Sequence, residues 1–434
     1  MAKRVLSTHG GAERAYLVGV QLKGTDESWT SANSLVELRE LARTAGLEVQ
    51  GETVQKLEAI NPATYVGKGK LEELKLLTRG SDVDIVVFDD ELSPNQQRNL
   101  EEELEIKIID RTALILDIFA RHARTREGAL QVELAQYVYR LPRLTRAWTD
   151  LAQQTGGAAA RGGATGVGLR GPGETQLETD RRFIRSHIAQ LERELDQVRS
   201  HRELYRRRRR EQGLPVVSLV GYTNAGKSTL LNALTHAGVV ATDALFVTLD
   251  PITRRLALPS GKEVLLTDTV GFIQKLPTQL VAAFRATLEE IGDADLILHV
   301  VDITHRYVHK QVETVQKTLA QIGAGSKPTL VALNKIDLLK DPQNAKAMAS
   351  EYASAVAVSA LYGWGLVELG TKIEAVLRRE MVRVLVRIPY GQDSLVVLFR
   401  QRGIVAREQY EETATLIEGD LPRPLMETFQ PFLI

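Results

Sequence analysis

The sequence predicts an α/β protein built around a mostly parallel sheet. A smaller N-terminal α/β domain, a long helical hairpin and a small C-terminal α+β domain accompany that sheet. Short apolar runs alternate with helical segments near the N-terminus and again in the second half, as in parallel sheets covered on both faces. Two segments between these regions have the apolar spacing of paired helices. A glycine-rich loop ending in Lys-Ser joins one apolar run to a helix.

The length of the chain calls for several domains, because 434 residues exceed what one compact core usually holds. We place an N-terminal α/β domain at 1–120 and an antiparallel helical hairpin with a glycine-rich tip at 121–212. The main α/β domain follows at 213–380, and a C-terminal α+β domain at 381–434. Hydrophobic content of 44% and charged content of 25% are ordinary for a globular protein.

Composition limits the partners and the compartment. The formal net charge is zero, so any basic surface must be local, and we expect no DNA partner. The absence of cysteine excludes disulfides and thiolate metal sites and suits a reducing cytosol. No apolar stretch is long enough to span a bilayer, and residues 1–4 are not followed by the apolar region of a signal peptide. We therefore expect a cytoplasmic protein without a membrane span, and a monomer.

The N-terminal domain is predicted from alternating elements. We expect strands at 15–20, 47–49, 85–88 and 106–109, and helices at 34–44, at 70–77 and from Ser93. Ser93 and Pro94 are typical of a helix cap and first helical position. Residues 66–70 (VGKGK) partly match a phosphate loop, but the full spacing is missing. They are either a glycine loop entering a helix or a second nucleotide site.

Two heptad-spaced seams predict the hairpin. The first consists of Leu130, Leu134, Tyr137, Leu141 and Leu144, and the second of Ile184, Ile188, Leu191, Leu195 and Val198. Steps of four and three place such residues along one side of a helix, so the two helices can pair. Residues 153–173 between them are rich in glycine and cannot form a core. That tip is either a disordered linker or a binding loop.

Five consecutive arginines, residues 206–210, end the second helix. Adjacent residues of a helix point in all directions, so they cannot all be paired within the protein. RNA phosphate is one partner for such a run, and a solvated helix end is the alternative. No aromatic residues interleave with the arginines, so we expect contacts to the RNA backbone and shape rather than base stacking.

The loop at 221–228 fits the phosphate-binding pattern G-x-x-x-x-G-K-[ST]. Its residues are Gly221, Tyr222, Thr223, Asn224, Ala225, Gly226, Lys227 and Ser228. An apolar run precedes it and a helical segment follows, as the pattern requires. The glycines let backbone amides surround phosphate oxygens, Lys227 reaches the β- and γ-phosphates, and the Ser228 hydroxyl ligates Mg²⁺. The alternative, an ordinary strand–helix turn, does not require Lys and Ser at these places.

Three further motifs follow predicted strands of the same domain, at 263–267, 329–333 and 355–358. They are the D-x-x-G of Asp268, Thr269, Val270 and Gly271, the N-K-x-D of Asn334, Lys335, Ile336 and Asp337, and Ser359, Ala360 and Leu361. In the D-x-x-G, the Asp holds Mg²⁺ through water and the Gly271 amide meets the γ-phosphate. Each motif stands at the carboxyl end of a strand, where open α/β sheets bind ligands.

In this order the four motifs resemble a translation-factor-class GTPase with the P-loop GTPase fold. The base specificity has a physical reason. The Asp337 carboxylate accepts hydrogen bonds from guanine N1–H and N2–H₂, which adenine lacks. Asn334 and Lys335 shape the base pocket, and Ala360 offers its backbone amide to guanine O6.

A narrower resemblance covers about 11–379, which is similar to the HflX family. It rests on residues 61–70, 109–112, 131–136, 171–174, 221–228 and 268–272. The resemblance implies a GTPase that binds the 50S ribosomal subunit and its rRNA and splits stalled ribosomes, notably under heat stress. In that picture the glycine-rich tip reaches toward rRNA near the peptidyl-transferase centre.

The same resemblance places the first switch. It corresponds to Phe246, Val247, Thr248, Leu249 and Asp250. Thr248 would be the second protein ligand of Mg²⁺, beside Ser228, with Thr242 and Thr253 as competing candidates. Lys227, Thr248 and Gly271 are then the catalytic residues. Phe272 stands where many relatives have a water-orienting glutamine, so intrinsic hydrolysis should be slow unless a partner, the ribosome, completes the site.

The C-terminal segment offers fewer signals. We expect strands at 382–388, 395–399 and 413–417 and leave the role of this domain open. His305 and His309 are four residues apart, but no third metal ligand is near in sequence, so we read them as a solvated helix face.

The sequence thus predicts a Mg²⁺-requiring GTPase that acts on ribosomes and releases GDP and phosphate. Two alternatives remain. One is a binding module in which hydrolysis only resets RNA affinity during subunit assembly. The other is an ATP-driven rRNA remodeller that uses the N-terminal domain as a second nucleotide site.

Overall fold

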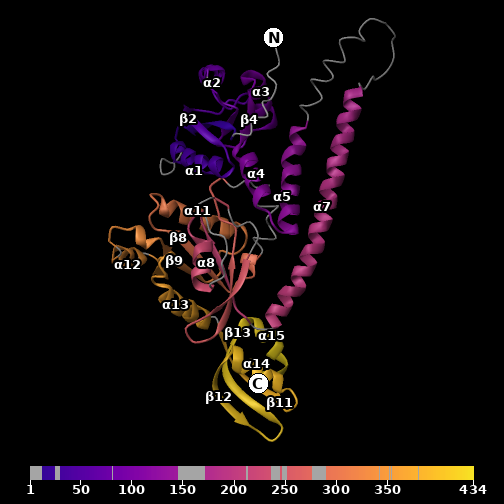
Figure 1. Ribbon diagram of the computed structural model, residues 1–434. Coiled ribbons are helices and arrows are strands. Elements are labelled where there is room, and N and C mark those ends of the chain that lie inside the picture. The colour runs from indigo at the N-terminus through magenta and orange to yellow at the C-terminus, as the bar shows by residue number, and fades with distance from the viewer. Residues whose placement is uncertain are drawn as a thin grey trace. The chain divides into compact units, whose positions relative to one another are not determined.

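The structure is a computed structural model, shown in Figure 1 with labels on many of its helices and strands. It describes residues 12–24, 30–80, 82–144, 172–211, 214–235, 245–246, 252–275, 290–341, 343–350, 352, 354–379 and 381–434. The chain divides into two compact units, Met1–Glu194 with Lys275–Ala283, and Leu195–Gln274 with Phe284–Ile434. The four-domain division given above is finer and stays a prediction.

The first unit contains a four-stranded parallel sheet. Its strands are β1 (Arg14–Leu22), β2 (Glu48–Leu57), β3 (Ile85–Phe88) and β4 (Lys107–Asp110), in the order β2-β1-β3-β4. All four predicted strands are present, but β2 continues to Leu57. Its second half is a polar edge strand, TVQKL, whose side chains are mostly half-buried, so apolar periodicity does not detect it.

Helices cover both faces of this sheet. They are α1 (Ser31–Thr44), α2 (Lys68–Gly80), α3 (Pro94–Leu104) and α4 (Arg111–His122). Val18 and Val20 of β1 pack in one cluster with Leu74 of α2 and Leu100 of α3. Gly19 points the other way, toward Leu35 of α1. Because side chains alternate along a strand, α2 and α3 lie on one face and α1 on the other.

The expected Ser93 cap is confirmed. Ser93 and Gln96 form a reciprocal capping box, with Pro94 in the first turn of α3. The VGKGK segment enters α2, as a glycine loop would. The Gly67 amide donates to Gln55 Oε1 at 2.9 Å, and Lys70 Nζ lies 2.9 Å from Thr53 Oγ1 and 2.7 Å from Glu73. The Lys70 ammonium thus contacts side chains of its own domain.

Helices α5 (Arg126–Arg140) and α7 (Pro172–Glu211) run antiparallel. Arg126, at the start of α5, lies 3.4 Å from Glu194, whereas Glu133 lies 3.0 Å from His187, earlier in α7. The second predicted seam is the less exposed side of α7, with Leu191 buried. None of the helices within the described ranges is long and apolar enough to cross a membrane.

The first seam is shorter than predicted. A 3₁₀ turn, η1 (Leu141–Arg143), replaces the last α-helical turn. Pro142 lacks an amide hydrogen and clashes with the preceding turn, which explains why α5 ends at Arg140. The glycine-rich tip falls largely in 145–171, outside the described residues, and so do the side chains of 206–210.

The second unit contains a six-stranded sheet. Its strands are β5 (Val216–Gly221), β6 (Ile252–Ala257), β7 (Glu263–Asp268), β8 (Leu296–Asp302), β9 (Thr329–Asn334) and β10 (Ala355–Ala357). The order is β10-β9-β8-β5-β7-β6, and only the β6–β7 pair is antiparallel. Helices α8 (Lys227–Thr235), α11 (Val308–Gln321), α12 (Gln343–Ala349) and α13 (Leu366–Arg379) accompany it (Figure 1). The predicted mostly parallel α/β fold is confirmed.

The C-terminal part folds as a three-stranded antiparallel sheet with helices. Its elements are β11 (Met381–Pro389), α14 (Asp393–Arg402), β12 (Ile404–Tyr410), β13 (Ala414–Pro422) and α15 (Met426–Phe429), with the strands in the order β11-β13-β12. The strand predicted at 395–399 is wrong, because these residues belong to α14. Val396 and Phe399 form its buried face at helical spacing, and a five-residue apolar run cannot distinguish the two structures.

His299 lies in the middle of β8 with only 2% of its surface exposed. Burial, with a smaller contribution from the nearby Lys227, lowers its pKa to about 4. The imidazole is therefore neutral in the folded protein at pH 7.

We expect this histidine to make the fold acid-sensitive. Between about pH 6.5 and pH 4 the unfolded chain binds a proton at His299 that the folded chain does not, so the free energy of unfolding falls by up to roughly 3 kcal/mol as the pH drops. Urea unfolding of wild type and His299→Leu between pH 7 and 4.5 measures this. The free energy of unfolding of wild type should fall more steeply toward low pH than that of His299→Leu, whereas the exposed His309→Gln should follow wild type. Parallel curves for wild type and His299→Leu would contradict the assignment.

Candidate functional site

The phosphate loop connects β5 to α8, and its shape depends on glycine. Gly226 has φ +91°, and a Cβ at this position would lie 2.3 Å from Asn334 Nδ2. Any other side chain would therefore clash with Asn334 as well as strain the backbone. Glycine at this position therefore lets the phosphate loop approach the Asn334 side chain closely.

Lys227 is buried inside this loop. Its ammonium donates to the carbonyl oxygens of Gly221 at 3.2 Å and Tyr222 at 2.9 Å. Burial lowers the pKa of Lys227 to about 8, although the Asp268 carboxylate opposes the shift. A cation held mainly by neutral carbonyl groups is poised to bind an anion, as a triphosphate requires.

The D-x-x-G residues continue from β7 onto the phosphate loop. The Ser228 hydroxyl donates to Asp268 Oδ2 at 2.6 Å, and Thr269 Oγ1 donates to the Leu219 carbonyl at 2.6 Å. A Cβ on Gly271 would lie 2.8 Å from Thr223 Cγ2 and 3.0 Å from Lys227 Nζ. Gly271 therefore sits directly against the loop, beside the lysine.

Phe272 is bound to the loop through its backbone. Its amide donates to the Gly221 carbonyl at 3.0 Å, and the Thr223 amide donates to its carbonyl at 2.8 Å. The ring is buried, with 2% exposed. A buried phenyl ring offers no hydrogen bond to an attacking water.

The Asn334 carboxamide joins three loops. Its Nδ2 donates to the Ala225 carbonyl at 2.9 Å, and its Oδ1 accepts from the Ala360 amide at 2.9 Å. This bridge brings the N-K-x-D and Ser-Ala motifs to the phosphate loop. A guanine O6 at the Ala360 amide would have to share that hydrogen with Asn334.

The other motif residues stand around this bridge. Ser359 Oγ donates to Asp337 Oδ1 at 2.5 Å and so orients the carboxylate. Lys335 has φ +66° and pairs with Asp302 Oδ2 at 2.7 Å. Asp302 is a residue that the sequence reasoning missed, although its place at the end of β8 is a signal that could have found it.

The remaining predicted residues divide into two groups. Thr242, Val247, Thr248, Leu249 and Asp250 lie outside the described residues, so the first switch stays a prediction.

The structure describes the residues of the second group. Phe246 is buried with φ +59°. Thr253, a competing metal ligand, is in β6 with its hydroxyl 3.0 Å from that of Thr267. Asn224, with φ +59°, and Leu361 are exposed, whereas Val270 and Ile336 are buried.

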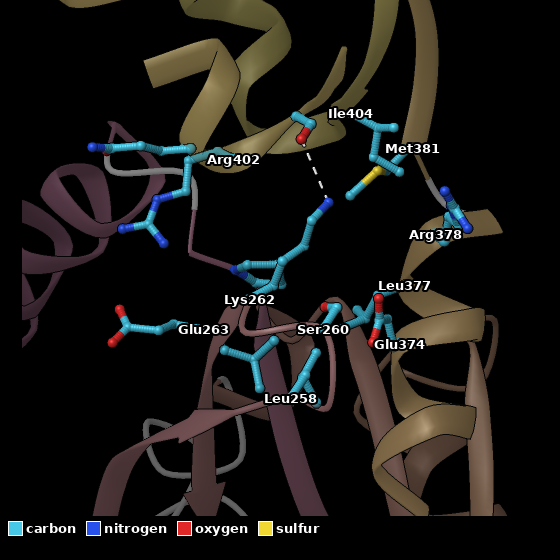
Figure 2. A pocket seen from close by; sticks show the side chains of 14 residues that line it. Leu258, Ser260, Lys262, Glu263, Glu374, Leu377, Arg378, Met381, Arg402 and Ile404 are labelled. Carbon is cyan, nitrogen blue, oxygen red and sulfur yellow. Dashed lines mark hydrogen bonds between the residues drawn. The ribbon is translucent and has the colours of Figure 1, made fainter. Parts of the chain in front are cut away.

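An apolar pocket of about 250 Å³ lies elsewhere in the second unit, between the β6–β7 turn, the end of α13 and the C-terminal sheet (Figure 2). Lys262 points across it and donates to the Gly403 carbonyl at 3.4 Å. Leu258, Leu377 and Ile404 contribute apolar walls. No residue of the four motifs lines this pocket, so the chemistry belongs to the strand ends.

A phosphate loop, D-x-x-G, N-K-x-D and Ser-Ala at the carboxyl ends of strands in one sheet define a GTPase of the P-loop class. Profiles described as GTP-binding GTPase N-terminal, GTP-binding GTPase Middle Region and 50S ribosome-binding GTPase match residues 32–120, 122–209 and 216–335. The chain belongs to the HflX GTPase family and hydrolyses GTP.

Relatives match along nearly the whole chain. The GTPase HflX of Caldanaerobacter subterraneus subsp. tengcongensis is 46% identical over 422 residues, 97% of this chain and 94% of the relative. The GTPase HflX of Escherichia coli is 44% identical over 383 residues, 88% of each chain. Among solved structures, the chain in a crystal structure of the SsGBP and GDP complex is 25% identical in sequence to this chain. The match has a TM-score of 0.46 and covers 84% of this chain and 98% of that chain.

Asp337→Asn should change the preferred base. The asparagine amide would oppose the guanine N2 amino group, so GTP affinity should fall about tenfold or more. The same amide can donate to the O2 carbonyl of xanthine, so XTP affinity should rise. Calorimetric titration of both nucleotides measures this, with the exposed Asp341→Asn as a matched control. Unchanged GTP affinity would show that Asp337 does not bind the base.

Proposed function

We propose that this chain is a Mg²⁺-dependent GTPase of the cytoplasm that binds the large ribosomal subunit and splits or rescues stalled ribosomes, for example during heat stress. The observation that carries this proposal is the convergence of four motifs on one sheet edge, within a chain that matches HflX relatives over most of its length. The profile description naming the 50S subunit supports the ribosomal partner.

The residues present fit Mg²⁺. The Ser228 hydroxyl and the Asp268 carboxylate lie 2.6 Å apart and offer the hard oxygen ligands that this ion prefers. We propose that Ser228 and Thr248 hold the ion directly and that Asp268 holds it through water. When bound, the ion offsets charge on the phosphate oxygens. Lys227 adds a buried positive charge beside them.

The remaining groups orient the nucleotide. We propose that Asp337 selects guanine, while the Gly271 amide contacts the γ-phosphate. Phe272 contributes no hydrogen-bonding side chain where a water must be oriented for attack. The chain alone should therefore hydrolyse GTP slowly, and a partner should supply the missing contact.

GTP turnover should rise about tenfold or more when 50S subunits are added, because the partner completes the site. Phosphate release at fixed GTP, with and without subunits, measures the effect. Lys227→Ala should show no turnover in either condition, which assigns the activity to this site. Equal rates for wild type with and without subunits would contradict the proposal.

Ribosome splitting is tested separately. Purified 70S particles incubated with the protein and GTP should yield separate 50S and 30S peaks on a sucrose gradient. A non-hydrolysable GTP analogue shows whether hydrolysis is needed for splitting or only for release. Binding through RNA phosphates should weaken steeply with salt in co-sedimentation. An unchanged 70S peak under both nucleotides would contradict splitting and leave an assembly role.

A further inference from the structure

The apolar pocket of about 250 Å³ in the second unit is large enough for a small ligand (Figure 2). The β6–β7 turn and the last turn of α13 form one side of it, and the residues that join α14 to β12 form the other. An apolar cavity of about 150 Å³ already accommodates a benzene ring. This pocket can therefore hold a ring or a short chain together with a polar group.

The floor of the pocket is part of the core of the second unit. Leu258, Val264 and Leu377 line the pocket and also belong to the buried cluster around the six-stranded sheet. In the opposite wall, a Cβ on Gly403 would lie 2.8 Å from the Phe399 carbonyl oxygen, so only glycine fits there and the wall is backbone. Because the core holds these atoms, the pocket keeps its shape without a ligand.

Three positively charged side chains line this apolar space, those of Lys262, Arg378 and Arg402. Arg378 is exposed, whereas Lys262 and Arg402 are half-buried. None of the three forms an ion pair with a carboxylate among the residues that the structure describes, and the buried Arg402 Nε has no hydrogen-bond partner there. Cations in apolar surroundings are unfavourable without a partner, so these groups gain from a bound anion.

Lys262 extends from the β6–β7 turn across the pocket (Figure 2). Its ammonium donates to the Gly403 carbonyl at 3.4 Å, which is longer than the usual N–H···O distance of about 2.9 Å. Burial lowers the pKa of Lys262. The Glu374 charge opposes this shift, Arg378 adds to it and Asp420 opposes it, but the pKa stays below its ordinary value. No carboxylate is thus close enough to offset the loss of water around this ammonium.

The charges around the pocket fit a ligand with a single negative charge. Against the three cations, the lining has two carboxylates, those of Glu263 and Glu374. Glu263 already lies 3.5 Å from Arg255, which is not part of the lining. The helices α13 and α14 both end at the pocket, and the partial negative charge of a helix C-terminus disfavours a polyanion. A nucleotide triphosphate is therefore a poor match.

We propose that this pocket binds a small monocarboxylate with an apolar body, either a single ring or a short alkyl chain. The carboxylate pairs with Lys262, and the body lies against the apolar floor of Leu258 and Leu377. This inference goes beyond the proposed GTPase function and does not depend on it, because no residue of the four motifs lines the pocket.

Methionine methyl groups report binding at this pocket directly. The chain has four methionines, of which Met381 lines the pocket, whereas Met348 and Met426 do not. The full chain, labelled at the methionine methyl groups for NMR and saturated with GDP and Mg²⁺ to occupy the phosphate loop, is titrated with hydrocinnamate and with octanoate. The Met381 resonance, identified with Met381→Leu, should shift saturably with a Kd of about 1 mM or below for at least one probe. The Met348 and Met426 resonances should not move.

The charge and the apolar body are then tested one at a time. Hydrocinnamamide has the ring without the charge, and acetate has the charge without the ring, so each should bind at least about tenfold more weakly than hydrocinnamate. Lys262→Gln keeps a donor near the Gly403 carbonyl but loses the charge, so the affinity for the carboxylate should fall about tenfold.

Lys327→Gln is the matched control, because Lys327 also donates to a backbone carbonyl, that of Ala294 at 2.8 Å, and does not line the pocket. It should bind both probes as wild type does. A Met381 resonance that stays in place with both probes would overturn the inference. Equal affinities for hydrocinnamate and its amide, or a Lys262→Gln affinity equal to that of wild type or of Lys327→Gln, would do the same. Failure of the chain to bind GDP before the titration would instead count against the proposed function.

Discussion

The site depends on one buried carboxamide. Asn334 donates to the phosphate loop at Ala225 and accepts from the Ala360 amide, so a single side chain fixes the distance between the phosphate-binding and base-binding loops. Gly226 is required because Asn334 occupies the space of its side chain. The loops that follow β5, β9 and β10 would otherwise move independently, and a nucleotide has to bridge them. The bridge pre-forms the site, which lowers the ordering cost of binding.

The electrostatics around Lys227 complete this picture. The ammonium is enclosed by backbone carbonyls, with Asp268 as a more distant counter-charge. Removal from water destabilises the charged Lys227 ammonium until a phosphate binds beside it. The contact between Lys227 and the phosphates therefore contributes binding energy close to the bond that is broken. The segment from Gly271 to Gln274 lies against the same loop, through the Phe272 backbone and the Gln274 amide.

Much of the fold could be predicted from the sequence because buried strands are apolar and end in residue types with a specific chemistry. The strands before Asp268 and Asn334 are examples. Polar edge segments such as β12 were missed, since nothing in Arg407 or Glu408 marks a strand. The helix containing Val396 was misassigned because a short apolar run fits either structure. Lys275 and Asp89, 186 positions apart, could not be paired from sequence, because only the tertiary fold brings them together.

The central claim is that one guanine nucleotide binds across this bridge, with its base at Asp337 and its phosphates around Lys227. Calorimetry of the magnesium-supplied protein with GTP and with ATP tests it most directly. The account predicts GTP binding at least about a hundredfold tighter, because adenine leaves the buried acceptor unpaired. Equal or tighter binding of ATP at this site would contradict it.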